Sequence, residues 1–213
     1  MTKDYSHFKN IVFDLGGVIV RLQPEVALAA FERIGMGHLF GKEAPAEARK
    51  AIEAIGLGFC SEQDFCDTLR RLSGSAATNA QIEEAADLML GEIPDRKKEM
   101  LMELRAEGHR VFLLSNTFEM HWRYCVRNLF PYLGFNVDDY FDQVFLSQRV
   151  HLQKPDPALF RLLLRQTRSL PSETLFIDDL EENCRAAESC GISTFQNKNF
   201  NDWMQIFPSS NNS

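Results

Sequence analysis

The sequence predicts an α/β fold: a doubly wound parallel sheet (Rossmann-like) that carries a small inserted all-helical cap domain. The first observation behind this prediction is that short, continuously apolar runs alternate with amphipathic helical segments along most of the chain. Uninterrupted apolar runs are typical of strands that helices cover on both faces. The second observation is that residues 24–91 have helical patterns only. This interval is too long for an ordinary connection between parallel strands, so it predicts a separate insert.

The predicted sheet has five strands. Their sequences are IVFDL at 11–15, RVFLLS at 110–115, QVFLS at 143–147, TLFID at 174–178 and ISTF at 192–195. Helices are predicted between these strands, with charged residues on one side and Leu, Met, Phe or Ala on the other, at 95–107, 156–166 and 181–190. The regular alternation of strand and helix is the pattern of a doubly wound domain.

The insert is predicted to contain four helices. Their sequences are PEVALAAFERIG, EARKAIEAIG, SEQDFCDTLRRL and NAQIEEAADLML. Pro24 suits the first turn of a helix, and Ser61 with Asp64 resembles a capping box, so local chemistry supports two of the helix starts. We therefore expect a helical cap at 21–92, an α/β catalytic core at 1–20 and 93–207, and a disordered tail, PSSNNS, at 208–213.

The composition favours a small-molecule ligand over a macromolecular one. A net charge of −7 argues against nucleic acid and anionic membranes as partners, because neither is attracted to an acidic surface. The chain has no apolar stretch long enough to cross a bilayer, and its first ten residues do not resemble a signal peptide, so we expect a cytoplasmic protein. The oligomeric state is not predicted. The five cysteines show no CxxC pair and are expected to be small buried residues rather than disulfides or zinc ligands.

Polar residues gather where the predicted strands end. Ligands of open α/β sheets bind at the carboxyl ends of the strands. The residues at those ends are Asp14, Ser115 with Asn116, Lys154, and the pair Asp178 and Asp179. Each has a structural alternative, because Asp, Ser and Asn often cap helices and a single lysine is often a solvated loop residue. Together, the carboxylates, hydroxyl, amide and cation predict a site for a phosphate and a divalent metal.

Four short segments carry a resemblance to a known family. In order, FDLGGVIV, LLSNT, KPDP and FIDDLEEN resemble the motifs of the haloacid dehalogenase-like hydrolase superfamily, over residues 10–195. The helical insert is similar to the cap of the first type in that family. The sequences DLGGVIV, LLSNTFEMHW, SQ at 147–148 and DD at 178–179 most resemble the α-D-glucose-1-phosphate phosphatase group.

The resemblance implies a Mg²⁺-dependent phosphatase that hydrolyses a small phosphorylated metabolite, most often a sugar phosphate. Asp14 would attack phosphorus and form an aspartyl-phosphate intermediate. The Asp14 carboxylate, the Gly16 carbonyl and the Asp179 carboxylate would hold Mg²⁺, a hard ion that prefers oxygen ligands. Asp178 would share the ion or orient its ligands.

The same resemblance assigns the phosphate contacts. Ser115, Asn116 and the amides that follow would bind phosphate oxygens at a helix N-terminus, where N–H groups favour an anion. Lys154 would neutralise the charge on Asp14 and the phosphate together. His151 departs from the family pattern, which has a glycine three residues before the lysine. If that turn needs a positive φ, histidine is tolerated there but strained.

A second departure concerns proton transfer. Most phosphatases of this superfamily have an aspartate two residues after the nucleophile, as general acid, and here that position is Gly16. Three explanations remain open: an easily expelled leaving group such as an anomeric phosphate, a replacement acid such as His121, or the absence of phosphatase activity. The alternatives in the last case are a metal-independent 2-haloacid dehalogenase with Asp14 as nucleophile, and a catalytically silent metabolite-binding protein.

Overall fold

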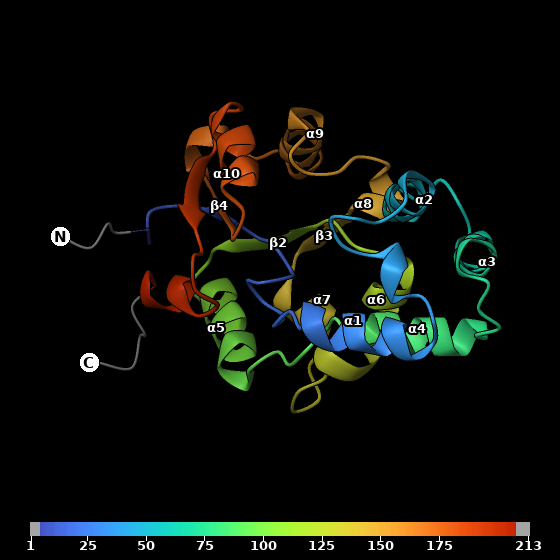
Figure 1. Cartoon of the computed structure of the whole chain (residues 1–213). Helices are drawn as coiled ribbons and strands as arrows, with labels where there is room; N and C mark the ends of the chain where they lie inside the picture. Colours follow the sequence, from blue (N-terminus) through green and yellow to red (C-terminus); the bar gives the residue numbers. More distant parts are fainter. Residues whose placement is uncertain (1–4, 208–213) are drawn as a thin grey trace.

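The fold was analysed in a computed structural model that describes residues 5–207. Its centre is a parallel sheet of five strands in the order β3-β2-β1-β4-β5 (Figure 1). The strands are β1 (Asn10–Phe13), β2 (Arg110–Ser115), β3 (Gln143–Leu146), β4 (Thr174–Asp178) and β5 (Ser193–Gln196). All neighbouring pairs are parallel, which confirms the predicted fold class and its five strands.

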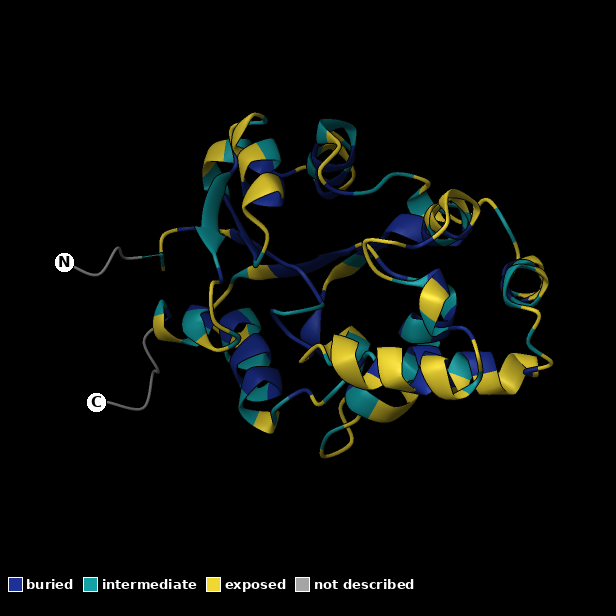
Figure 2. Ribbon diagram, viewed as in Figure 1, coloured by how far each residue is buried: buried dark blue, intermediate teal, exposed yellow. Residues whose placement is uncertain are grey.

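Helices cover both faces of this sheet. Figure 1 shows α9 and α10 on one side and α5 with α7 on the other. Their bounds are α5 (Asp95–Ala106), α7 (Val137–Tyr140), α9 (Pro157–Thr167) and α10 (Glu181–Glu188). Side chains of β1 alternate between the two faces, so Ile11 and Phe13 pack in the cluster that includes α5, and Val12 packs in the cluster that includes α9. β1 and β4 are accordingly buried along their whole length, whereas the edge strand β5 is intermediate (Figure 2).

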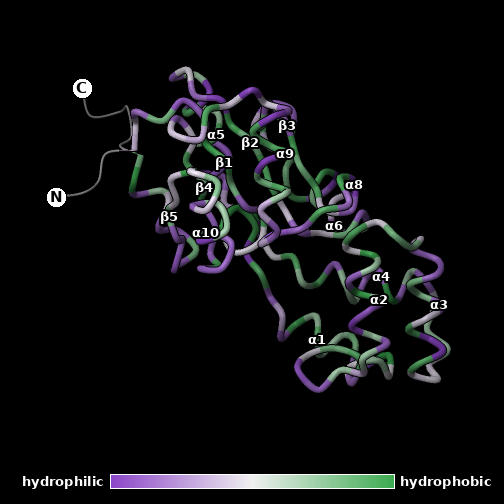
Figure 3. The backbone as a smooth tube through the Cα atoms, turned by 90° about the horizontal axis from the view of Figure 1, so that it is seen from above, coloured by the Kyte–Doolittle hydropathy of each residue, from purple (hydrophilic) through white to green (hydrophobic). Residues whose placement is uncertain are grey.

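Four helices lie between β1 and α5 in the sequence. They are α1 (Pro24–Arg33), α2 (Ala46–Gly56), α3 (Glu62–Ser73) and α4 (Asn79–Asp87). Pro24 begins α1, and Ser61 with Asp64 forms the predicted capping box of α3. In Figure 3 these helices lie together, beside the strands of the sheet rather than over them. They have an apolar core of their own, which two side chains from the segment after β2 complete, Phe118 and Met120.

Two short linkers connect the four helices to the sheet. Leu22 and Leu90 form an antiparallel bridge. The backbone N–H of Gln23 donates to the Met89 carbonyl at 2.9 Å, and that of Gly91 donates to the Arg21 carbonyl at 2.7 Å. The chain therefore enters and leaves the four-helix unit at the same place.

The remaining elements are short and lie in the connections between helices and strands or, for η4, after the last strand. They are η1 (Gly37–Leu39), α6 (Glu119–Tyr124), the π-helical turn η2 (Cys125–Leu129), α8 (Ser147–Val150), η3 (Pro171–Glu173) and η4 (Asp202–Gln205). No helix within residues 5–207 is both long and apolar enough to cross a membrane. Three of the five cysteines, Cys66, Cys125 and Cys184, are buried as expected. The tail predicted to be disordered, 208–213, lies outside the described residues.

Candidate functional site

Three predicted site residues meet at the carboxyl end of the sheet. Asp14 follows β1, and Asp178 ends the neighbouring strand β4. The Lys154 ammonium lies between their carboxylates, with Nζ 2.6 Å from Asp14 Oδ1 and 2.7 Å from Asp178 Oδ2. All three residues are buried. Lys154, far from both aspartates in sequence, is thus the cation of this cluster.

Burial and charge act against each other in this cluster. Burial alone would lower the pKa of Lys154, but the ion pairs with Asp14 and Asp178 outweigh it and the net pKa is raised. Burial raises the pKa of Asp14 to about 7, Lys154 opposes this shift, and the Asp178 carboxylate adds to it. One ammonium therefore faces two carboxylates, which leaves excess negative charge in a buried place.

Asp179 adds a third carboxylate to the same region. One oxygen each from Asp14, Asp178 and Asp179 can be chosen so that all three lie within 4.8 Å of one another. Burial, and then the charge of Asp178, raise the pKa of Asp179. An all-oxygen donor set with excess negative charge suits Mg²⁺, which would offset the repulsion among the three aspartates. The residues present therefore fit this ion.

The two neighbouring aspartates differ in how they are held. Asp178 is wholly buried, and its Oδ1 accepts hydrogen bonds from the Leu180 backbone N–H and from Asn183 Nδ2, both at 2.9 Å, while its Oδ2 faces Lys154. Asp179 is partly exposed and makes no ion pair within the described residues. Asp178 is thus committed to protein donors, whereas Asp179 can turn its carboxylate to a metal.

The turn after β1 is shaped by two glycines. Gly17 has φ +72°, and a Cβ built on it would lie 2.7 Å from Asp179 Oδ2, so only glycine fits there. Gly16 lacks a positive φ, but a Cβ on it would lie 3.1 Å from Leu22 Cδ1. Leu22 belongs to the first linker. An apolar side chain therefore lies next to the position where most related phosphatases have their general acid.

Ser115 and Asn116 follow the neighbouring strand β2. Ser115 is buried at the end of that strand. The Asn116 side chain holds the Lys154 backbone at both ends, since its Nδ2 donates to the Lys154 carbonyl at 2.8 Å and its Oδ1 accepts from the Lys154 N–H at 2.9 Å. Asn116 therefore positions Lys154, and any contact of Asn116 with phosphate would involve its backbone.

The helix expected directly after Ser115 begins later. Its first residue is Glu119, and Phe118 before it has extended backbone. Both backbone groups of Thr117 are bonded to Ser147 instead of to a helix: the Thr117 N–H donates to Ser147 Oγ at 3.0 Å, and Ser147 Oγ donates to the Thr117 carbonyl at 3.3 Å. The position of His121, expected one and a half turns into the helix, is corrected to its first turn. Ser147 was not predicted as a site residue, although SQ at 147–148 was part of the resemblance.

His121 is placed unfavourably for donating a proton. Its Nε2 lies 3.0 Å from the Ala86 carbonyl oxygen of α4 and so carries the proton of that hydrogen bond. Burial lowers the pKa of His121 to about 4, with the Ala86 hydrogen bond acting in the other direction. At neutral pH the ring is therefore uncharged, and its one N–H is already used.

His151 joins the helical insert to the loop that leads to Lys154. It has φ +56°, as expected if the turn needs a left-handed residue. Its Nδ1 lies 2.7 Å from the Leu57 carbonyl oxygen, and its ring stacks on Phe59 with centroids 5.5 Å apart. The backbone of Gly58 lies so close to Gln148 that a Cβ would be 2.1 Å from the Gln148 carbonyl oxygen. The α2–α3 loop is thus in direct contact with the core next to Lys154.

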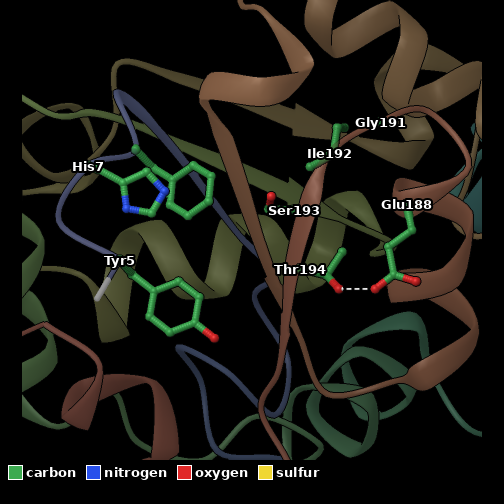
Figure 4. A pocket seen from close by; sticks show the side chains of 8 residues that line it. Tyr5, His7, Glu188, Gly191, Ile192, Ser193 and Thr194 are labelled. Atoms are coloured by element: carbon green, nitrogen blue, oxygen red, sulfur yellow. Dashed lines mark hydrogen bonds between the residues drawn. The ribbon is translucent and has the colours of Figure 1, made fainter. Parts of the chain in front are cut away.

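A separate pocket of about 520 Å³ lies at the edge strand β5. Its lining residues come from the N-terminal segment and from the region of β5: Tyr5, His7, Phe8, Glu188, Gly191, Ile192, Ser193 and Thr194. In Figure 4 Glu188 and Thr194 are joined by a hydrogen bond, which measures 2.6 Å. None of the predicted site residues lines this pocket, so the candidate site rests on the aspartate–lysine cluster.

The sequence is similar to known hydrolases over most of its length. The family model of haloacid dehalogenase-like hydrolases matches residues 8–191. D-ribitol-5-phosphate phosphatase of Bacteroides thetaiotaomicron is 34% identical over 199 residues, which are 92% of this chain and 95% of the relative.

Solved structures of hydrolases are also similar to this chain over most of its length. The crystal structure of a HAD family enzyme from Bacteroides thetaiotaomicron, in complex with magnesium and inorganic phosphate, has a TM-score of 0.87 and 34% identity, covering 94% of this chain and 100% of that one. A HAD-like family hydrolase from Porphyromonas gingivalis has a TM-score of 0.84 and 31% identity, covering 93% of this chain and 95% of that one.

Proposed function

The chain belongs to the haloacid dehalogenase-like hydrolases, and we propose that it hydrolyses a small phosphorylated metabolite, a sugar or sugar-alcohol phosphate, with Mg²⁺ and an aspartyl-phosphate intermediate on Asp14. The observation that carries this proposal is the buried group of Asp14, Lys154 and Asp178 with Asp179 beside it. The name of the relative from Bacteroides thetaiotaomicron supports the class of substrate. The structure crystallised with magnesium and phosphate supports the cofactor.

In the first step an Asp14 carboxylate oxygen forms a bond to phosphorus while the bond from phosphorus to the alcohol oxygen breaks. Lys154 holds the Asp14 carboxylate through Oδ1 and offsets the charge of the incoming phosphate. Asp14, Asp179 and the Gly16 carbonyl would hold Mg²⁺, which when bound supplies positive charge to the phosphoryl oxygens. In the second step water attacks phosphorus and releases Asp14.

The alcohol oxygen must gain a proton without a carboxylate at position 16. Leu22 packs against Gly16, and His121 is uncharged with its N–H on Ala86. We therefore assign no proton transfer to His121 and propose that the leaving group is expelled with little help. An anomeric oxygen meets this requirement better than a primary alkoxide does, so hexose-1-phosphates are expected to be cleaved faster than the 6-phosphates of the same sugars.

The relative from Bacteroides thetaiotaomicron points to a different leaving group. Ribitol 5-phosphate is the ester of a primary alcohol, whose oxygen is a poor leaving group without protonation. Both ester types therefore belong in the first substrate panel. A preference in kcat for the anomeric esters supports expulsion without an acid, because that effect arises only in the transition state.

The test is a screen of the purified protein against phosphorylated sugars and sugar alcohols with Mg²⁺ and with EDTA. Phosphate release that needs Mg²⁺ is expected from the wild type and not from Asp14→Asn, whose amide is nearly isosteric but cannot attack phosphorus. Halide release from 2-haloacids in EDTA would instead identify a dehalogenase. A folded protein that binds phosphorylated metabolites but releases no phosphate would be the silent binding protein.

A further inference from the structure

The segment after β5 contacts both loops from which the expected metal ligands come. Gln196 Nε2 donates to the Asp179 carbonyl at 3.2 Å. The next residue, Asn197, donates from Nδ2 to the Gly17 carbonyl at 3.0 Å. One of these loops carries Gly16, and the other carries Asp179. Two consecutive side chains therefore tie together segments that are more than 160 residues apart in sequence.

Asn197 is the central residue of this connection. It is 1% exposed, and its backbone N–H donates to the Asp178 carbonyl at 2.8 Å. Its Oδ1 accepts the backbone N–H of Trp203 at 2.9 Å. Both ends of its amide and its own N–H are therefore bonded at once. Because Asn197 is buried, moving one of its partners would leave a polar atom of Asn197 unpaired, which is costly.

The turn after β1 has a second support one residue further on. The Val18 carbonyl accepts a hydrogen bond from Trp203 Nε1 at 3.0 Å and another from Lys97 Nζ. Lys97 is completely buried, and its Nζ also donates to the Phe200 carbonyl at 2.6 Å and lies 3.1 Å from the centroid of the Phe200 ring. The carbonyls of Gly17 and Val18 are thus both held by donors, from α5 and from the segment after β5.

These contacts bear directly on the proposed metal site. A Cβ on Gly17 would lie 2.7 Å from Asp179 Oδ2, so the Asp179 carboxylate lies close beside the Gly17 backbone. A small shift of the turn would change the distance between the Gly16 carbonyl, the Asp14 carboxylate and Asp179. The positions of these groups determine how well a Mg²⁺ ion, with its strict octahedral geometry, is bound.

We propose that Asn197 is a positioning residue for Mg²⁺: its side-chain amide holds the Gly17 carbonyl while its backbone N–H holds the Asp178 carbonyl, so that it fixes the separation between the Gly16–Gly17 turn and the Asp178–Asp179 strand end. This inference rests on the proposed function, because it assumes that the ion binds there. Residues that orient metal ligands without touching the ion typically change metal affinity by 10–100-fold when they are replaced. Asn197 would contribute in this way although it follows the last of the four motifs.

The direct test is calorimetric titration of Mg²⁺ into the phosphate-free protein. For Asn197→Ala we expect the dissociation constant to rise about tenfold. The matched control is Asn10→Ala, because Asn10 is also a buried asparagine, 3% exposed, but sits at the opposite end of β1 with Nδ2 on the Glu173 carbonyl at 3.3 Å. Asn10→Ala is expected to lower thermal stability and leave the Mg²⁺ dissociation constant unchanged.

A second variant covers the case in which Asn197→Ala does not fold. Trp203→Phe keeps an aromatic ring against Phe13 but removes one of the two donors to the Val18 carbonyl and leaves Lys97 as the other. A rise of a few-fold in the Mg²⁺ dissociation constant is expected for it. In turnover, both variants should need more Mg²⁺ for half-maximal rate, with kcat at saturating Mg²⁺ close to the wild type.

The outcomes separate the inference from the function on which it rests. Wild-type protein that binds no Mg²⁺ would overturn the proposed function itself. Wild-type protein that binds Mg²⁺, with folded Asn197→Ala and Trp203→Phe binding it equally well, would overturn the positioning role. An equal loss of affinity in Asn10→Ala would also overturn it, since general destabilisation would then explain the effect.

Discussion

Asp178 and Asp179 are adjacent in sequence but have different surroundings, so their replacement by alanine should have different effects. Asp178→Ala removes one of two carboxylates from the buried Lys154 ammonium and leaves Asn183 Nδ2 without its acceptor. Breaking a buried pair costs about 3 kcal/mol or more, so a clear loss of thermal stability is expected. Asp179→Ala should leave stability nearly unchanged and lower the affinity for Mg²⁺. Thermal unfolding and Mg²⁺ titration of both variants measure the two effects.

Equal loss of Mg²⁺ affinity in both variants, with unchanged stability, would mean that the two carboxylates share the ion. The surroundings of Asp178 favour a structural role for it and a metal-binding role for Asp179, since both Asp178 oxygens already accept hydrogen bonds from the protein.

The space next to Gly16 predicts how a general acid could be installed. In Gly16→Asp the new Cβ would lie about 3.1 Å from Leu22 Cδ1, so the leucine would have to move slightly. We expect Gly16→Asp with Leu22→Ala to cleave 6-phosphates at least tenfold faster than Gly16→Asp alone, because a positioned acid contributes typically about 10²–10⁴-fold. Leu22→Ala by itself is the control. A double variant no faster than Leu22→Ala would show that position 16 does not face the leaving group.

The pKa of Asp14 predicts competition between protons and metal. Burial raises this pKa to about 7, and a protonated carboxyl group is a poor ligand. The affinity for Mg²⁺ should therefore fall as the pH drops below about 7 and reach a plateau above it, with proton release on binding. Mg²⁺ titrations in two buffers of different ionisation enthalpy, between pH 6 and 8, measure both. Binding without proton release at pH 6.5 would contradict this expectation.

At the scale of elements, the contact between the α2–α3 loop and the core depends on one glycine. Gly58 and Gly74 have nearly the same φ, +70° and +71°, but a Cβ on Gly58 would be 2.1 Å from the Gln148 carbonyl oxygen and one on Gly74 would meet nothing. Gly58→Ala should thus lose about 1–3 kcal/mol more stability than Gly74→Ala, whose cost is backbone strain alone.

The two glycine variants should also differ in catalysis. Moving the α2–α3 loop away from His151 would change the surroundings of the nearby Lys154. We therefore expect KM to rise for Gly58→Ala and to stay unchanged for Gly74→Ala. Thermal unfolding and steady-state kinetics of both variants measure this. Identical stability and KM in the two variants would show that the loop is free to move away from the core.

Elements with a repeated pattern could be predicted from the sequence, and those fixed by a distant partner could not. The five strands are continuous apolar runs, and the capping box of α3 is formed by residues close together in sequence, so both could be predicted. The late start of α6 could not be predicted, because the backbone of Thr117 just before it is bonded to Ser147, which lies 30 residues away.

The same distinction applies to the site. Asp14, Asp178 and Asp179 stand at strand ends, where the topology of a parallel sheet brings side chains together, and Lys154 reaches them from the loop that follows β3 and α8. Asn116 was expected to bind phosphate, but its side chain is hydrogen-bonded to the Lys154 backbone. Asn197 belongs to none of the sequence motifs, so its contact with the Gly17 carbonyl could not be predicted. Both act through contacts that exist only after the chain has folded.

For the molecule as a whole, one partly buried carboxyl group contributes a pH dependence of stability. Asp87 at the end of α4 has an Oδ1 with no hydrogen-bond partner within residues 5–207, and burial, followed by the Glu83 charge, raises its pKa to about 7. The unfolded chain loses this proton near pH 4, so stability falls as the pH rises from about 4 to 7 and is then constant. Asp87→Asn should therefore be more stable than the wild type above pH 7.

The expected gain for Asp87→Asn is about 1–2 kcal/mol, less than the full pKa shift would give, because the carboxyl group is partly solvated. For a chain of this size that corresponds to a rise of about 2–8 °C in melting temperature at pH 8. At pH 4 the two proteins should melt together. A constant difference across this range would trace the effect to packing rather than to ionisation.

The paired linkers at Leu22 and Leu90 have a consequence for how such proteins diversify. Because the two ends of the inserted unit are hydrogen-bonded to each other, a replacement unit of different length needs only to present two adjacent ends. The sheet and the loops that hold Asp14, Lys154 and Asp179 would not have to change their spacing. A single recombination event could therefore exchange the whole four-helix unit without disturbing the aspartate–lysine cluster.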